Sequence, residues 1–128
     1  MAENNLFYQD PAGQYSKGVK RKERKMINIL LASGIGASTG FMAASMRKYA
    51  KEKKLDVKVN AVSKSQVMEY ADKIDVLLLG PHFSQEVGKY REMLKDNNVK
   101  VTSIDPDYYA ALDGESILED AIDFYEND

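Results

Sequence analysis

Hydrophobic and polar positions along this chain alternate in blocks that predict strands and helices in turn. Mainly apolar runs at 26–32 and 75–79 are typical of strands covered on both faces of a parallel sheet. Residues 56–62 alternate apolar and polar side chains, as a half-exposed edge strand does. A fourth strand is predicted at 100–104, and it stops at Asp105-Pro106, where we expect the Asp105 side chain to form a cap or turn.

Between these strands, apolar residues recur at the three- and four-residue spacing of amphipathic helices. Helices are predicted from Ser38 to about Lys54, over Ser65–Asp72 with Ser65 as N-cap, from Ser84 to about Asp96, and over Asp113–Tyr125. Four methionines are expected on the core faces of these helices: Met42, Met46, Met68 and Met93.

Strand–helix alternation with buried strands predicts an α/β fold. We expect a four-stranded parallel sheet in the order 2-1-3-4 with helices on both faces, a three-layer sandwich resembling a shortened flavodoxin-like or phosphatase-like fold. Ligands of such sheets bind beyond the carboxyl ends of the strands, between the first and third. The loops at Ser33–Thr39 and Gly80–Ser84 are therefore predicted to face the same crevice.

The first 24 residues have no hydrophobic period and are predicted to be a disordered basic tail, a tag or a linker. The folded domain is predicted over 25–128, and Met26 could be a natural start. Residues 1–25 hold six basic and three acidic groups, a net charge of +3, so the remainder carries −5 of the overall −2. This acidic body argues against nucleic-acid binding, which depends on neutralising phosphates.

Composition excludes several kinds of chemistry. The 128 residues include no cysteine and one histidine, which rules out disulfides, thiol catalysis and the usual zinc sites, so no metal or cofactor is expected. No apolar segment approaches the ~20 residues of a membrane span, and no secretory signal opens the chain. We therefore expect a cytoplasmic protein without direct membrane insertion.

The first strand runs into a loop rich in glycine and hydroxyl groups, Ser33-Gly34-Ile35-Gly36-Ala37-Ser38-Thr39-Gly40, which opens a helix. Backbone N–H groups and a helix N-terminus that converge in this way bind phosphate. Three familiar phosphate loops do not match. The third glycine of the dinucleotide fingerprint is displaced to Gly40, the triphosphate loop lacks its lysine, and a phosphatase loop would need cysteine at its first position and arginine at its end.

The same loop resembles the active loop of enzyme IIB of the sugar phosphotransferase system, lactose/cellobiose/chitobiose class. In that family a cysteine usually begins the loop, with glycine three positions on and Ser-Thr at five and six, which Gly36, Ser38 and Thr39 match. The resemblance extends over most of 26–128. It includes the strand end Asp-Val-Leu-Leu-Leu-Gly-Pro at 75–81, the strand end Ile104-Asp105, and the helix entry Leu112-Asp113-Gly114.

The resemblance implies a phosphocarrier. Enzyme IIB accepts a phosphoryl group from a phosphohistidine on enzyme IIA and passes it to a sugar of the β-glucoside, cellobiose or lactose type bound by the membrane permease, enzyme IIC. In this chain Ser33 would be the attachment point. The loop residues from Gly34 to Thr39 (Gly34, Ile35, Gly36, Ala37, Ser38 and Thr39) would form the anion cradle. Association with a membrane permease follows from the same resemblance.

Ser33 departs from the family at the nucleophile. A thiol ionises near neutral pH, particularly at a helix N-terminus, whereas a serine hydroxyl needs an adjacent base. Transfer is therefore expected to be silenced, either by a cysteine-to-serine substitution introduced to freeze the carrier or by natural loss of activity. His82, after Gly80-Pro81, is a possible neighbour: a polar wall residue, a base for Ser33, or itself a phosphate acceptor.

Two other functions stay open. A IIB-like domain without transfer could dock a partner as a regulatory binding module, with Phe41 or Met42 as an apolar rim for enzyme IIA. A small flavodoxin-like domain could instead bind the phosphate of a nucleotide or flavin. A magnesium pocket of the receiver type is not expected, because Asp75 begins its strand and so lies at the wrong end of the sheet.

Overall fold

A computed structural model describes residues 26–34 and 39–127 of the 128-residue chain. The predicted tail at 1–24 and loop residues 35–38 lie outside the described residues. Four parallel strands form one sheet in the order β3-β2-β4-β5, which confirms the predicted 2-1-3-4 arrangement. The strands are β2 (Ile27–Ser33), β3 (Val57–Ser63), β4 (Val76–Leu79) and β5 (Lys100–Ser103).

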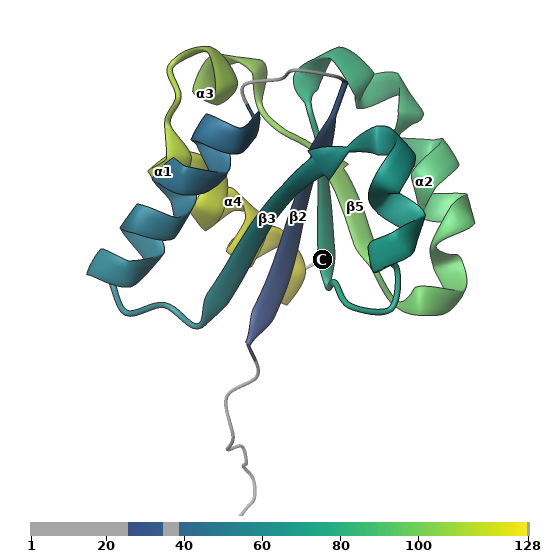
Figure 1. Ribbon diagram of the computed structural model, residues 1–128, viewed down its shortest axis with the longest axis horizontal. Coiled ribbons are helices and arrows are strands. Elements are labelled where there is room, and N and C mark those ends of the chain that lie inside the picture. The colour runs from purple at the N-terminus through teal and green to yellow at the C-terminus, as the bar shows by residue number, and fades with distance from the viewer. Residues whose placement is uncertain (1–25, 35–38, 128) are drawn as a thin grey trace, which may run out of the picture.

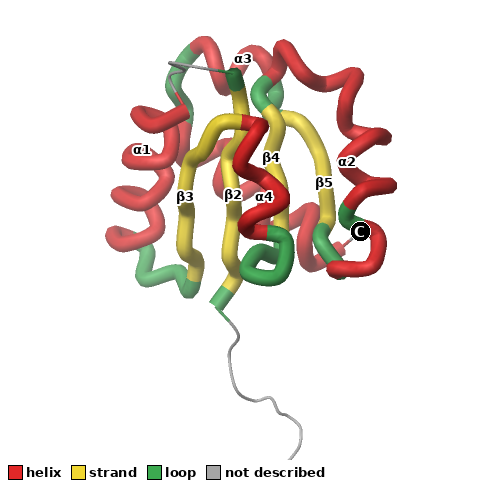
Figure 2. Tube along the Cα trace, turned by 45° about the vertical axis from the view of Figure 1, so that its right-hand side comes forward, coloured by secondary structure: helices red, strands yellow, loops and turns green. Residues whose placement is uncertain are grey.

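Helices cover both faces of this sheet. The longer ones are α1 (Thr39–Glu52) and α4 (Gly114–Asn127), and shorter ones are α2 (Val87–Met93) and α3 (Pro106–Ala110). Three 3₁₀ segments complete the chain: η1 (Lys64–Tyr70), η2 (Pro81–Glu86) and η3 (Lys95–Asn97). Figure 1 shows α1 on one side of the strands and η1 with α2 on the other, and the tube in Figure 2 shows the strands between them. Among the described residues, no helix combines the length and apolarity that crossing a bilayer requires.

Two separate hydrophobic clusters lie on the two faces of the sheet. Alternate residues of β2 point to opposite sides, so Ile29 and Leu31 join one cluster and Leu30 and Ala32 the other. The first cluster packs β2, β3 and β4 against α1 and α4, and the second packs the sheet against η1 and α2. This double burial explains why the strand is apolar from Ile29 to Ala32.

The close packing of α1 on α4 depends on one glycine. A Cβ atom added at Gly114 would lie 2.3 Å from the Ser45 hydroxyl oxygen and 2.9 Å from the backbone nitrogen of Met46. Across the same contact, the hydroxyl of Tyr49 donates a hydrogen bond to the Glu119 carboxylate. That hydrogen bond, with smaller contributions from burial and the carboxylate charges of Glu119 and Glu115, raises the pKa of Tyr49 to about 12.

On the other face, the predicted helices are shorter and more broken than expected. The single helix expected from Ser84 to about Asp96 is divided into η2, α2 and η3, and Phe83 interrupts η2 with φ −117° and ψ 21°. The N-cap of η1 is Ser63 and not Ser65. The Ser63 hydroxyl accepts a hydrogen bond from the Ser65 backbone N–H, and the Gln66 side-chain oxygen accepts one from the Ser63 backbone N–H. These two reciprocal hydrogen bonds form a capping box.

Two of the four methionines predicted on core faces lie elsewhere, and the turn after β5 holds an extra helix. Met42 and Met46 are fully buried as expected, but Met68 and Met93 are 47% and 42% exposed, since the short segments that carry them turn those positions outward. The loop after β5 contains helix α3, which the sequence pattern did not reveal. Asp105 caps it by accepting hydrogen bonds from two backbone N–H groups, which confirms the predicted cap beside Pro106.

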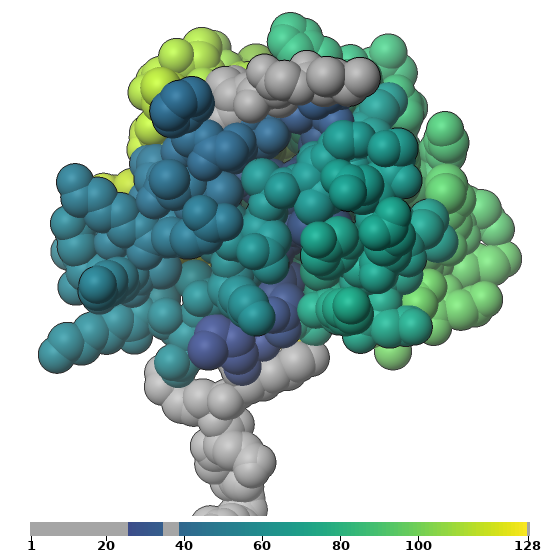
Figure 3. Space-filling model, viewed as in Figure 1, coloured from purple at the N-terminus to yellow at the C-terminus, as the bar shows by residue number. Residues whose placement is uncertain are grey.

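The carboxyl ends of all four strands lie at one edge of the molecule, at the top of Figure 1. Asp75 lies at the opposite edge, where its carboxylate accepts a hydrogen bond from the Asn28 backbone N–H at 2.8 Å. It therefore fixes the start of the sheet and is remote from the loops at the carboxyl ends. In the space-filling view of Figure 3, η1 and the end of β3 lie between α1 and the segment that carries α2.

Candidate functional site

The two described ends of the first loop are joined by their hydroxyl groups. Ser33 ends β2 and Thr39 begins α1, and both side chains are buried, each 5% exposed. Their oxygen atoms are 3.3 Å apart, within hydrogen-bond distance. The Ser33 hydroxyl also donates to the Gly34 carbonyl oxygen at 3.2 Å. The loop therefore leaves the sheet and returns to the helix at nearly the same point.

This closure brings the start of a fourteen-residue helix next to the end of the central strand. The first backbone N–H groups of a helix lack partners within it and carry partial positive charge, so an anion beside Ser33 would be stabilised there. Residues 35–38, predicted to complete the cradle, lie outside the described residues. The roles of Ile35, Gly36, Ala37 and Ser38 stay predictions.

The loop after β4 adjoins the loop after β2, as predicted from the strand order. The Gly80 backbone N–H donates to the Ala32 carbonyl oxygen at 2.9 Å. A Cβ atom added at Gly80 would lie 3.4 Å from Cβ of Ser33. A Cβ atom added at Gly34 would lie 3.4 Å from Cζ of Phe83, so this ring forms one wall at the start of the loop.

His82 lies in the same segment, η2, but its side chain is exposed. Phe83, the next residue, is the one whose ring reaches Gly34. Among the described residues, the partners of the Ser33 hydroxyl are a carbonyl oxygen and another hydroxyl, and neither is a general base. His82 as a neighbour of the acceptor position stays a prediction.

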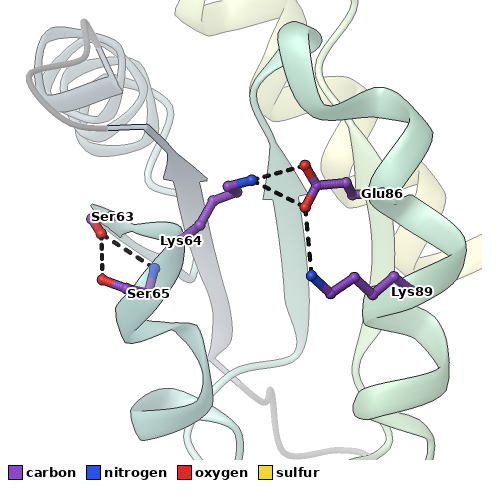
Figure 4. Close-up of polar contacts among 5 residues, drawn as sticks. All are labelled: Ser63, Lys64, Ser65, Glu86 and Lys89. Carbon is purple, nitrogen blue, oxygen red and sulfur yellow. Dashed lines mark hydrogen bonds and ion pairs between the residues drawn. The ribbon is translucent and has the colours of Figure 1, made fainter.

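A lysine and a glutamate form a pair across this wall (Figure 4). Lys64 follows β3, and its ammonium nitrogen lies 3.0 and 2.8 Å from the two carboxylate oxygens of Glu86. The same nitrogen lies 3.8 Å from the centroid of the Phe83 ring, a cation–π contact. Both charged side chains are only 25% exposed, and Lys89 approaches the same carboxylate at 4.0 Å.

Sequence reasoning missed Lys64 and Glu86 as residues of this site, and it included Phe83 only as part of the loop Gly80–Ser84. Lys64 and Glu86 are 22 positions apart, and no motif or helical spacing connects them. The only available signal was the strand order, which places the residues that follow β3 and β4 on the two sides of β2.

An exposed aromatic side chain stands next to the loop on the α1 side. Phe41 is 77% exposed in the first turn of α1, while its neighbour Met42 is fully buried. Among the described residues, Leu112 is another large apolar side chain that is more than half exposed, at 51%. Contiguous apolar patches are typical of surfaces that contact other proteins, whereas single exposed apolar side chains are ordinary. Of the two residues predicted as an apolar rim, Phe41 alone is accessible.

Titratable groups elsewhere in the described chain do not suggest a metal site. No three or more His, Cys, Asp or Glu side chains gather in a way that could hold an ion, within 26–34 and 39–127. A hollow of about 330 Å³ lies at the free side of β5, where Asp105 and Asp120 accompany apolar walls from α3 and α4. Burial, followed by the negative charge of Asp105, raises the pKa of Asp120. This hollow is lined by residues of β4, β5, α3 and α4 and by none of the loop residues Ser33, Gly34 or Thr39.

Comparison with known proteins agrees with this geometry. A sequence model of the lactose/cellobiose-specific IIB subunit of the phosphotransferase system matches residues 28–120. The chain belongs to this IIB family. It is 29% identical over 102 residues to the oligo-β-mannoside-specific EIIB component of Bacillus subtilis strain 168, covering 80% of this chain and 99% of that protein.

Two solved IIB structures are also similar. The cellobiose-specific IIB component of Borrelia burgdorferi is 31% identical with a TM-score of 0.64, covering 79% of this chain and 93% of that one. The lactose-specific IIB domain of Streptococcus pneumoniae is 12% identical with a TM-score of 0.73, covering 80% and 100%. At that identity the second likeness shows a shared fold. The chain is therefore a IIB component of the lactose/cellobiose type with the parallel α/β sandwich of its family.

Proposed function

We propose that this IIB component is a phosphocarrier whose acceptor position is Ser33 and whose cradle is the loop from Gly34 to Thr39. The observation that supports the proposal is the placement of Ser33. It ends the central strand β2, it is buried, and its hydroxyl meets that of Thr39 at the first residue of α1. A group attached at this point would lie at the positive end of a helix, where a dianion is stabilised.

Transfer at this site would take place in two balanced steps. In the first, the N–P bond of a phosphohistidine on enzyme IIA breaks as a bond from phosphorus to the acceptor atom forms, and the histidine nitrogen is released with its lone pair. In the second, that bond breaks as an O–P bond to a sugar hydroxyl forms, and the hydroxyl proton is released. Enzyme IIA and the sugar-bearing permease IIC are thus the proposed partners.

The serine makes this chain a silenced carrier. A serine hydroxyl is protonated at neutral pH and attacks phosphorus only when a base removes its proton. The partners of Ser33 in the described structure, the Gly34 carbonyl and the Thr39 hydroxyl, do not provide that base. A cysteine at the same position would ionise without one, since a helix N-terminus lowers the pKa of a thiol.

Similarity to other components supports a substrate class. The relatives are named for cellobiose, lactose and oligo-β-mannosides, which are β-linked glycosides. We propose a β-linked di- or oligosaccharide as the final acceptor, bound by the permease and not by this chain. The exposed ring of Phe41 beside the loop is the proposed contact point for enzyme IIA.

A phosphotransfer assay tests the proposal. The chain and its Ser33→Cys variant are incubated with labelled phosphoenolpyruvate, the general phosphotransferase proteins and a IIA of the lactose/cellobiose type. We expect the parent chain to carry no acid-stable label, which phosphoserine would give. We expect Ser33→Cys to be labelled, and alkylation of its cysteine before the assay to prevent the labelling. Ser103→Cys, which places a cysteine at the end of β5 instead of β2, is the matched control and is expected to stay unlabelled.

A second function follows if both chains stay unlabelled. A IIB-like binding module would still dock enzyme IIA without accepting phosphate, and the observation that favours it is the absence of a base among the described partners of Ser33. Binding of unphosphorylated IIA to the parent chain, weakened by Phe41→Ser but unaffected by Ser33→Cys, would support the module. Label on Ser33→Cys would exclude the binding module, because it would show that the loop can still accept a phosphoryl group.

A further inference from the structure

We propose that Lys64 is a second source of positive charge for the acceptor loop, and that Glu86 sets how much of that charge the phosphoryl group experiences. The inference deepens the proposed function and rests on it. It concerns a side-chain ion pair outside the loop, whereas the cradle itself consists of backbone N–H groups and hydroxyls.

The strand register places Lys64 beside the loop. Ser33 and Ser63 are partners at the end of the β2–β3 ladder, and Lys64 is the residue that follows Ser63 at this carboxyl edge. Neighbouring strands are about 5 Å apart, so the chain enters η1 at Lys64 one residue after a position that lies close to Ser33. Lys64 is therefore next to the acceptor loop before its side chain is considered.

The Lys64 side chain then crosses the end of β2. Glu86 belongs to the segment after β4, and β4 lies on the other side of β2 from β3. To reach Glu86, the lysine side chain extends from the β3 side to the β4 side, as Figure 4 shows. Its ammonium lies over the Phe83 ring, whose Cζ would be 3.4 Å from a Cβ on Gly34. The Phe83 ring thus contacts both the ammonium and the start of the loop.

Opposed charges at this position have opposite effects on an anion in the loop. The Lys64 ammonium attracts a thiolate or phosphoryl dianion, and the Glu86 carboxylate repels it. With both side chains only 25% exposed, solvent screens them less than it screens a fully exposed pair. The titratable groups in contact at this corner are Lys64 after β3, Glu86 in η2 and Lys89 in α2. His82 belongs to the same segment as Glu86, and its side chain is exposed.

A pair of this kind suits a carrier. An unopposed cation would hold the phosphoryl group tightly and slow its departure to the sugar, while an unopposed carboxylate would hinder its arrival. With the two in contact, each limits the influence of the other, and the loop accepts and releases the group with similar ease.

The test exploits the difference in sign. In the Ser33→Cys background, the thiol pKa is measured from the pH dependence of alkylation, with no donor protein present. One unit charge acting through partly screened protein surface shifts a thiol pKa by about half a unit to one unit. Lys64→Gln should raise the pKa of the introduced thiol by that amount, Glu86→Gln should lower it, and Lys64→Arg should restore the parent value.

Phosphoryl transfer gives a second readout in the same variants. At equilibrium with phosphorylated IIA, Lys64→Gln should lower the ratio of phosphorylated to free carrier by about 3- to 10-fold, and Glu86→Gln should raise it by a similar factor. Lys95 and Glu92 form the matched control, because their ion pair is also 2.8 Å long but the two side chains are 62% and 73% exposed. Lys95→Gln and Glu92→Gln should leave both readouts unchanged.

The outcomes separate this inference from the proposed function. If the pair only braces the fold, removing either partner breaks the same contact, and both variants shift the thiol pKa in the same direction or not at all; that result overturns the inference. If the thiol pKa shifts in opposite directions but the Ser33→Cys variant takes no label from IIA, the charge pair is supported and the carrier function fails.

Discussion

The two faces of the sheet are built differently. On one face, two fourteen-residue helices, α1 and α4, pack closely on each other and on the strands through a fully buried cluster. On the other, η1, η2, α2 and η3 are each three to seven residues long. Side chains hold these short pieces: a capping box at Ser63, the Lys64–Glu86 ion pair, and a hydrogen bond between Asn97 and Asp72 at 2.6 Å.

The two faces contribute different residues to the surroundings of Ser33. The long-helix face supplies α1, whose first residue, Thr39, meets the hydroxyl of Ser33. The short-segment face supplies Phe83, Lys64 and Glu86, whose polar contacts can rearrange at small cost. The proposed acceptor position Ser33 thus lies between a face of long helices and a face of short segments.

The largest effect is expected from the cores of the two faces. Leu118→Ala, on the α4 side, should lower the free energy of unfolding by about 4 kcal/mol, because two long helices cannot collapse into the cavity. Leu94→Ala, equally buried at the end of α2, should cost about 2 kcal/mol, since short segments relax more easily. Urea unfolding of both variants measures the difference. Equal losses would contradict the comparison.

The next effect concerns one glycine on each face, Gly114 in α4 and Gly88 in α2. Gly114→Ala should destabilise the protein by about 2 kcal/mol, because the new methyl group would collide with Ser45 and the Met46 backbone. Gly88→Ala in α2 is the matched control: nothing lies within 4 Å of an added Cβ, so it should stabilise by up to about 1 kcal/mol. Thermal unfolding checks both. A gain in stability from Gly114→Ala would show that α1 and α4 can move apart freely.

A smaller effect is expected at the cap of η1. Ser63→Ala removes the hydroxyl that accepts from the Ser65 backbone, and should cost about 1 kcal/mol in the free energy of unfolding. Ser65→Ala should cost less, since that residue bonds Ser63 through its hydroxyl and caps nothing itself. Hydrogen exchange of η1 amides should rise in Ser63→Ala while that of α4 stays constant. The reverse order of the two losses would restore Ser65 as the cap.

The smallest effect depends on pH and lies on the long-helix face. The pKa of Tyr49 is raised from 10.0 to about 12, so folding favours the protonated phenol. The stability this provides is complete below pH 10 and is lost as pH rises through about 12. Tyr49→Phe should therefore show a shallower fall of the urea midpoint over this range than the parent. Parallel falls in the two proteins would mean that the Glu119 contact does not persist in solution.

The sequence predicts the sheet well because its strands are determined by burial. Runs such as 75–79 are apolar at nearly every position since both faces are covered, and the alternation at 56–62 reports an edge strand. The long helices were equally clear, because each has several turns over which the apolar period can repeat.

The parts that sequence reasoning missed are short or depend on distant residues. α3 spans five residues, too few for a period, and η2 and η3 were merged into a single helix for the same reason. At the site, the motif predicted Ser33 and Thr39, whose spacing is fixed by the chain. Lys64 follows β3 and Glu86 lies in the segment after β4, and the sheet places these two strands on either side of β2. Their contact therefore depends on the strand order, and nothing local in the sequence encodes it.

The alternation of β2 has a consequence for how this family can change over evolution. Ile29 and Leu31 belong to one cluster and Leu30 and Ala32 to the other, so deleting or adding one residue in the strand would exchange the two sets. The same slip would carry Ser33 away from Thr39. The two clusters therefore fix the number of strand residues that lead to Ser33.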